Sequence, residues 1–163
     1  MKRIIAEIVP MTRSHSETCS RIVAVSEPWK TLHERIDFSK YMALKQAYVY
    51  IQGGETAGFI IFTPEPVFAR GGYIRAVAVA PLMRRLGIGE KLLSFAETMI
   101  ARRASHAYLC VSSFNRRGQM FYRSLGYRRV GSLPDLIVRG ASEYIYWKRL
   151  RPLPLKNRRI HRL

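Results

Sequence analysis

The chain has 163 residues, 48% of them hydrophobic, and a formal net charge of +17. This length suits one domain with a substantial core, and the composition excludes a disordered chain. With only two cysteines, no apolar run of about 20 residues and no signal-peptide pattern at the N-terminus, we expect a cytoplasmic protein without a membrane span or a disulfide framework.

The spacing of apolar residues predicts strands and helices along the whole chain. Apolar β-branched runs predict strands, and apolar residues three and four positions apart predict helices. In chain order we expect a strand at 3–12 ended by Pro10, a helix at 14–27 capped by Ser14 or Ser16, a helical region at 31–46 made of one helix or two short ones, a hairpin of strands 47–52 and 56–65, a strand at 72–81, a helix from Ile88, a strand at 106–114, a helix from Asn115 to Gly126, and strands at 127–138 and 142–150. This order predicts an α/β layer fold with a mixed sheet. We assign residues 1–150 to one domain and 151–163 to a basic C-terminal tail.

Two glycines, Gly87 and Gly89, stand at the beginning of the predicted helix in "VAPLMRRLGIGEKLLSFAE". Each costs about 1 kcal/mol of helix stability relative to alanine. A strand, a short loop and a glycine-rich helix start present unpaired amides to an anion. Leu92 excludes the dinucleotide fingerprint, and Glu90 excludes the P-loop pattern. The segment therefore predicts an anion site of another kind.

A second segment, "FNRRGQMFYRSLGY", follows about twenty-five residues later. The two segments together resemble the GNAT family of acyl-CoA N-acyltransferases. The first family pattern is [QR]-x-x-G-x-[GA], which this chain matches from Arg84. The second is N-x-x-[AG]-x-x-[FL]-Y-x-x-x-G-[FY], which this chain matches from Asn115. The resemblance covers roughly residues 45–149, and the family includes the ribosomal-protein alanine acetyltransferases. It implies a mixed, mostly antiparallel sheet flanked by helices, with splayed central strands that hold acetyl-CoA. It also implies an acetyl-CoA-dependent N-acetyltransferase, in which a primary amine attacks the thioester directly.

The resemblance also implies the residues of the acetyl-CoA site. Backbone amides at 84–89 would bind the pyrophosphate, and the amides of Val77 and Val79 would bind the thioester carbonyl. Tyr122 would be the general acid for the leaving thiolate, the alternative being a packed helix tyrosine. The residues expected to bind the cosubstrate are Val77, Val79, Arg84, Arg85, Leu86, Gly87, Ile88, Gly89, Asn115 and Tyr122.

The general base does not follow from the family pattern. Some relatives carry a glutamate in the strand before the Asn115 helix, where this chain has Cys110. Others carry it early in the preceding strand, where this chain has Tyr73 and Arg75. We interpret Cys110 as a small buried hydrophobe rather than a nucleophile. The base is left open between Glu27, Glu143, Asp135 and a chain of water molecules.

Three residues are predicted to lie at the acceptor. Glu27 and Trp29 belong to the "SEPW" loop, which lines the acceptor pocket in the family, while a packing role for Trp29 is an equal alternative. Arg75 either binds a substrate carboxylate, pairs with Glu143, or points outward from the sheet. The four histidines lack metal-ligand spacing, and we expect no metal.

The basic charge is concentrated in the C-terminal part of the chain. Residues 101–163 contain 15 Lys and Arg against two Asp and Glu, a net charge of +13. The expected acceptor is a small-molecule amine, a protein N-terminus or a lysine. The charge also predicts an anionic partner such as RNA or the ribosome. The alternative function is a nucleic-acid- or ribosome-binding module with this fold and no catalysis. Whether the chain is a homodimer is left open.

Overall fold

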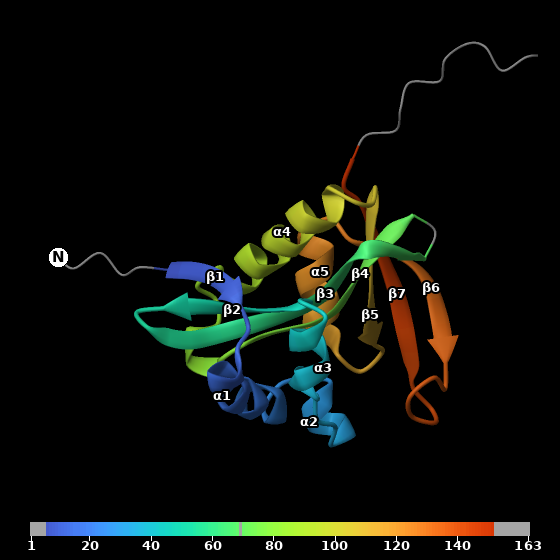
Figure 1. Cartoon of the computed structure of the whole chain (residues 1–163). Coiled ribbons are helices and arrows are strands. Elements are labelled where there is room, and N and C mark those ends of the chain that lie inside the picture. Colours follow the sequence, from blue (N-terminus) through green and yellow to red (C-terminus); the bar gives the residue numbers. More distant parts are fainter. Residues whose placement is uncertain (1–5, 69, 152–163) are drawn as a thin grey trace, which may run out of the picture.

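The computed structural model describes residues 6–68 and 70–151 and shows one seven-stranded sheet with helices on both sides (Figure 1). The strands lie in the order β1-β2-β3-β4-β5-β7-β6, and all neighbours are antiparallel except β4 and β5. The strands are β1 (Ala6–Pro10), β2 (Ala47–Gln52), β3 (Glu55–Phe68), β4 (Gly71–Val79), β5 (His106–Ser112), β6 (Arg128–Pro134) and β7 (Ser142–Arg149). The helices are α1 (Arg13–Ala24), α2 (Trp29–Leu32), α3 (Phe38–Ala43), α4 (Ile88–Ala101) and α5 (Arg116–Ser124), with a 3-10 turn at Pro81–Met83. The mixed, mostly antiparallel sheet is thus confirmed.

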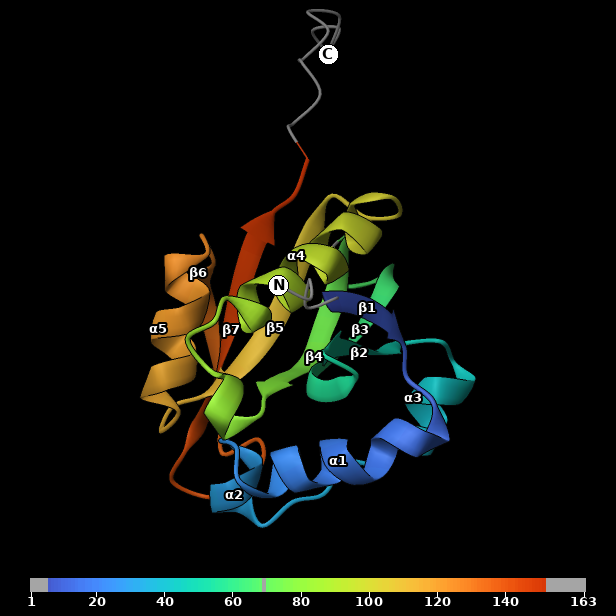
Figure 2. The same cartoon turned by 90° about the vertical axis from the view of Figure 1, so that its left-hand side faces the viewer.

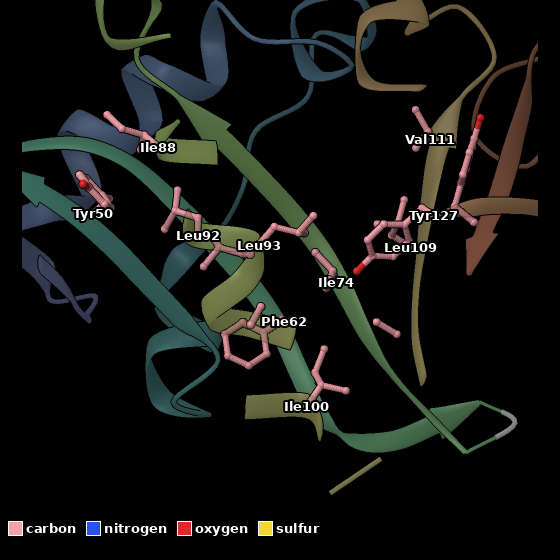
Figure 3. Packing of buried hydrophobic residues seen from close by; sticks show 14 of the residues in the cluster. Tyr50, Phe62, Ile74, Ile88, Leu92, Leu93, Ile100, Leu109, Val111 and Tyr127 are labelled. Carbon is pink, nitrogen blue, oxygen red and sulfur yellow. The ribbon is translucent and has the colours of Figure 1, made fainter. Parts of the chain in front are cut away.

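Two hydrophobic clusters hold the layers together, one on each face of the sheet. The larger cluster joins the sheet to α4 and α5, and ten of its buried side chains are labelled in Figure 3. The smaller cluster joins β2, β3 and β4 to α1 and α3 on the opposite face. Figure 2 shows α4 and α1 on either side of the sheet. Because a fully buried Leu, Ile or Phe contributes about 1.5–3 kcal/mol, the two clusters fix the strands that form the site.

Helix α4 begins where the sequence predicts it and buries the predicted stripe. Ile88, Leu92, Leu93, Ala96 and Ile100 are each 1% exposed or less. Their spacing of three and four residues places them on one face, which packs against β3, β4 and β5. The packing fixes the position of the N-terminus of α4 at the end of β4.

The central strands β4 and β5 pair only over part of their length. Gly71–Ile74 lie beside His106–Leu109 in parallel, and the pairing then ends. The β3–β4 register shifts between the pairs of Ile74 and Ala76, so Arg75 is the extra residue of a bulge. Bulges bend a strand and disrupt the ladder locally. The C-terminal half of β4 therefore turns away from β5, as the splayed strands of the prediction require.

Several boundaries differ from the prediction for local reasons. The N-cap of α1 is Thr12, whose amide donates to Nδ1 of His15 at 3.1 Å, so neither Ser14 nor Ser16 is the cap. The helical region at 31–46 is two short helices, α2 and α3, and α2 begins earlier, at Trp29.

The last hairpin is shorter than predicted. Strand β6 ends at Pro134, and Asp135 has a φ of +54° and accepts a hydrogen bond from the Gly140 amide at 2.6 Å. This turn takes residues 135–138 out of the predicted strand. The first predicted residues, 3–5, and the tail from residue 152 onward lie outside the described residues.

Within the described residues, no helix is both long and apolar enough to span a membrane.

Candidate active site

A cleft of about 880 Å³ opens where β4 and β5 separate. Its walls come from β4 and β5, the N-terminus of α4, helix α5, and the segment from the end of α1 to α3. The cleft therefore brings together the two sequence motifs, which lie about twenty-five residues apart. The predicted site residues that line it are Glu27, Trp29, Arg75, Val77, Val79, Arg84, Arg85, Gly87, Ile88, Gly89, Asn115 and Tyr122. Leu86 does not line it: its side chain is 55% exposed, so only its backbone can serve the site.

The loop before α4 presents a row of amides that the protein itself leaves unused. Among residues 6–68 and 70–151, the amides of Arg85–Glu90 donate to no protein acceptor. Arg85 and Gly87 both have positive φ, at 64° and 76°, which turns these amides outward. Such an arrangement at a helix N-terminus attracts an anion through its amides and the helix dipole.

Glycine is required at positions 87 and 89 for different structural reasons. A Cβ on Gly87 would meet nothing within 4 Å, so only its left-handed backbone requires glycine. A Cβ on Gly89 would lie 3.2 Å from Cζ of Phe121 in α5. Gly89 therefore lets α5 approach the beginning of α4, a packing role that the sequence analysis missed.

Arg84 is already engaged by the protein. Its Nε donates to the carbonyl of Val79 at 3.0 Å, and one terminal nitrogen donates to Oγ of Ser26 at 3.1 Å. The side chain thereby ties the end of β4 to the loop after α1. Arg85, in contrast, is exposed, so it is the arginine that can add a full positive charge to the anion site.

Val77 and Val79 direct their amides into the opening between the strands. The Ala80 amide donates to the Ala57 carbonyl of β3 at 2.8 Å. Because amides alternate in direction along a strand, those of Ala78 and Ala76 also point toward β3, and those of Val77 and Val79 point away from it. The Arg84 bond to the Val79 carbonyl lies on this same open side. Two unpaired donors thus face the cleft where a carbonyl oxygen could accept them.

Helix α5 is fixed to the end of β5 by side chains of its first two turns. The side-chain oxygen of Asn115, Oδ1, accepts from the Gly118 amide at 2.9 Å, which is the predicted N-cap. A Cβ on Gly118 would lie within 2.7–3.0 Å of the Asn115 side chain, so the glycine of the motif makes room for the cap. Gln119 donates to the carbonyls of Ser112 and Ser113 at 3.3 and 3.0 Å.

Tyr122 lies on α5 and lines the cleft that opens where β4 and β5 separate. Its ring makes edge contacts with Phe121 and Tyr127, with centroids 5.2 and 5.8 Å away. Burial raises the pKa of the Tyr122 phenol above its ordinary value. The phenol therefore keeps its proton through neutral and moderately alkaline pH and can donate it.

The three carboxylates considered as bases have different surroundings. Glu27 lines the cleft and accepts a hydrogen bond from the Thr31 hydroxyl at 2.8 Å. Asp135 is engaged in the β6–β7 turn. Glu143 is 7% exposed and lies opposite Ser112, and burial raises its pKa. A raised pKa brings a carboxyl closer to the range of a useful base, but Glu27 lines the cleft and Glu143 is not among its lining residues, so both carboxylates are tested.

Cys110 and Tyr73 occupy the strand positions where the family pattern would place a carboxylate. Tyr73 pairs with Tyr108 near the end of the β4–β5 ladder and Cys110 follows the last paired residue of β5, and both side chains line the cleft. Burial raises the pKa of the Cys110 thiol, with Glu143 contributing further, while hydrogen bonding to Tyr73 opposes the shift. Because the thiolate is the nucleophile, a raised pKa supports a structural role for Cys110.

Trp29 and Arg75, the residues expected at the acceptor, both line the cleft. The Trp29 ring packs against Phe59, with centroids 6.3 Å apart, so it contributes to the core as well as to the cleft wall. Arg75 is exposed and has no ion pair among the described residues, so the predicted alternative of a pair with Glu143 is wrong.

No metal site is formed by the part of the chain that the structure describes, where no group of three or more His, Cys, Asp and Glu is close enough to bind an ion.

The comparisons with known proteins agree with this arrangement. Residues 10–127 match the family model described as the acetyltransferase (GNAT) family. The sequence has no significant match among curated proteins.

Solved structures share the fold at low sequence identity. Ard1 from Thermoplasma volcanium is 20% identical with a TM-score of 0.76, over 90% of this chain and 99% of its own. An aminoglycoside 6'-N-acetyltransferase complexed with coenzyme A is 20% identical, with a TM-score of 0.71 over 91% and 99% of the two chains. The ribosomal-protein-S18-alanine N-acetyltransferase from Escherichia coli is 17% identical, with a TM-score of 0.70 over 93% and 98%.

Proposed function

The chain belongs to the acetyltransferase (GNAT) family, and from this premise we propose that it transfers the acetyl group of acetyl-CoA to a primary amine by direct attack. The observation that carries the proposal is one continuous cleft lined by both motif segments, with two sets of unpaired amides facing it. Structural relatives that include a coenzyme A complex support the choice of cosubstrate.

The residues present fit acetyl-CoA at both of its polar groups. The amides of Arg85–Glu90 and the exposed Arg85 side chain are suited to its pyrophosphate. The amides of Val77 and Val79 are suited to its thioester oxygen. Acetyl-CoA supplies an activated acyl group: the amine nitrogen forms the new C–N bond, the C–S bond then breaks, and the proton that the amine loses passes to water or to an enzymic base.

The chain's own residues would assist at three points. The Val77 and Val79 amides stabilise the negative charge that develops on the carbonyl oxygen during attack. The protonated Tyr122 phenol donates its proton to the departing sulfur. Arg84 holds the end of β4 in place through the Val79 carbonyl, so the two amides keep their direction.

The proposed function is tested by measuring release of free CoA thiol from acetyl-CoA. The acceptors are amino acids, polyamines, aminoglycosides and peptides with free N-termini, and a reaction without acceptor is the control. We expect thiol release to depend on an acceptor and to match the amount of acetylated amine found by mass spectrometry. Absence of acetyl-CoA binding, measured by calorimetry, would overturn the proposal.

We predict that the low-pH limb of kcat/KM follows the basicity of the acceptor. Attack requires a neutral amine, and α-amines have a pKa near 8 whereas lysine amines have one near 10.4. The limb should therefore move upward by about two pH units when an α-amine is replaced by a lysine-type amine. The rate at each pH is measured under kcat/KM conditions with both acceptors.

A limb at the same pH for both acceptors would contradict this and reveal an enzymic base. Glu143→Gln would then remove the limb if Glu143 is that base, with Glu27→Gln as the comparison. If Glu143 is the base, the rate falls as the pH decreases through its folded-state pKa, which burial raises, because only the deprotonated carboxylate can accept a proton.

Other expectations from the sequence stay predictions. They are the cytoplasmic location, a homodimer, and an RNA or ribosomal partner for the basic C-terminal part. A nucleic-acid-binding module without catalysis remains the rival function and rests on charge alone. A thermal shift with acetyl-CoA, compared with RNA binding at two salt concentrations, separates the two, since binding through phosphates weakens steeply with salt.

A further inference from the structure

We propose that Arg75 and Lys40 form an anion subsite around the Tyr41 ring, which takes a carboxylate carried by the acceptor amine. The inference rests on the proposed function and deepens it by naming the class of acceptor. The four residues involved, Arg75, Lys40, Tyr41 and Tyr73, all line the cleft.

The geometry converges on one aromatic ring. Cζ of Arg75 lies 5.8 Å from the centroid of Tyr41, and Nζ of Lys40 lies 4.8 Å from the same centroid. Arg75 also lies 5.5 Å from the ring of Tyr73 on its own strand. Tyr41 is 8% exposed and belongs to the core beneath α1, so the ring is held in place by packing. Two cations from elements far apart in sequence are thus brought to one wall of the cleft.

The protein does not neutralise these two cations with an ion pair. The ion pairs among the described residues involve other basic side chains, namely Arg21, Arg103 and Lys148. Asp37 is an acidic group near Lys40, but the two form no ion pair, and the Asp37 carboxylate accepts from the Ser39 amide at 3.0 Å as the cap of α3. Both cations line the same cleft within 6 Å of the Tyr41 ring centroid, so an anion bound at this wall would be attracted by each of them.

Carboxylate is the anion that this arrangement suits. A guanidinium presents a planar pair of N–H donors that matches the two oxygens of a carboxylate. Arg75 precedes Val77 by two residues on an extended strand, about 7 Å along it. An amine held at the thioester can therefore reach the subsite with a carboxylate in the same small molecule or short peptide.

The overall charge favours the same class of acceptor. A chain with a net charge of +17 repels polycations and attracts anions over a long range. Polyamines and aminoglycosides are therefore expected to be poor acceptors compared with amines that carry a carboxylate.

The test compares pairs of acceptors that differ only in the carboxylate, namely lysine against cadaverine and tyrosine against tyramine. We expect the carboxylated member to have a kcat/KM about 10- to 100-fold higher, the effect of one or two charge-assisted hydrogen bonds. Arg75→Ala should abolish this ratio, mainly through KM, and Lys40→Ala should reduce it. Arg128→Ala, an exposed arginine of β6 outside the cleft, is the matched control and should preserve the ratio. Phosphoethanolamine against ethanolamine tests phosphate in the same way, and a larger preference there would overturn the assignment to carboxylate.

A binding measurement separates this proposal from the proposed function. Calorimetry with CoA and N-acetyltyrosine, compared with CoA and N-acetyltyramine, reports the subsite without turnover. Tighter binding of the carboxylated product, lost in Arg75→Ala, supports the subsite even if acetyl transfer is slow. Equal binding of both products, or an Arg75→Ala enzyme that retains the preference, would overturn it while leaving acetyl transfer unaffected. Failure of acetyl-CoA itself to bind would instead remove the proposed function.

Discussion

Gly87→Val should lower the affinity for acetyl-CoA by about 10- to 100-fold, the loss expected when one or two charge-assisted hydrogen bonds to the pyrophosphate are broken. The new side chain projects into open space, because a Cβ at this position meets no protein atom within 4 Å. It would stand among the outward-facing amides of Arg85–Glu90 and block their approach to an anion. The affinity is measured by calorimetry with acetyl-CoA.

Gly54→Val is the matched control for this substitution. Gly54 has a φ of +85° and equally open surroundings, but it lies in the β2–β3 turn and does not line the cleft. Both valines impose a backbone strain of about 1–2 kcal/mol, so both variants should lose similar stability. Wild-type affinity in a folded Gly87→Val protein, or an equal loss in Gly54→Val, would show that the pyrophosphate binds elsewhere.

Tyr122→Phe should lower kcat by about 100-fold and leave the acetyl-CoA affinity nearly unchanged. The phenol is expected to act on the departing sulfur, so its contribution appears mainly in the transition state. General-acid contributions run from about 100- to 10,000-fold, and a thiolate is a tolerable leaving group, which favours the low end. Because burial raises the pKa of Tyr122, the phenol stays protonated, and its ionisation should cause no fall in rate below about pH 10.

Tyr127→Phe gives the comparison within the same cluster. The Tyr127 ring lies beside that of Tyr122, and its hydroxyl is buried without a hydrogen-bond partner among the described residues. Removal of this hydroxyl should leave kcat close to that of the wild type. If Tyr122→Phe retained full activity in a folded protein, the acid assignment would fall and the acetyl-CoA site would remain.

The sequence predicted those features that depend on local pattern. The apolar stripe of α4, the cap at Asn115 and the glycines of the two motifs are all readable over a few residues, and the structure brings them to one cleft. The family resemblance supplied the splay of β4 and β5, which residue spacing alone would not indicate.

Features that depend on contacts between distant segments were not predicted. The bond from Arg84 to Ser26 joins residues 58 positions apart, and it engages one of the two neighbouring arginines, Arg84 and Arg85, that could have bound the anion. The approach of Arg75 in β4 to Tyr41 in α3 joins side chains 34 positions apart, which no local pattern specifies. The packing of Phe121 against Gly89 was not predicted either, because this contact exists only in the folded protein.

Acetyl-CoA is proposed to lie in the cleft between the separated halves of β4 and β5. A crystal structure of the protein with acetyl-CoA tests this most directly. We predict that the pyrophosphate accepts hydrogen bonds from amides within Arg85–Glu90 and that the thioester oxygen lies within hydrogen-bonding distance of the Val77 or Val79 amide. A ligand bound with its pyrophosphate on another surface, or with its thioester turned away from β4, would contradict the account.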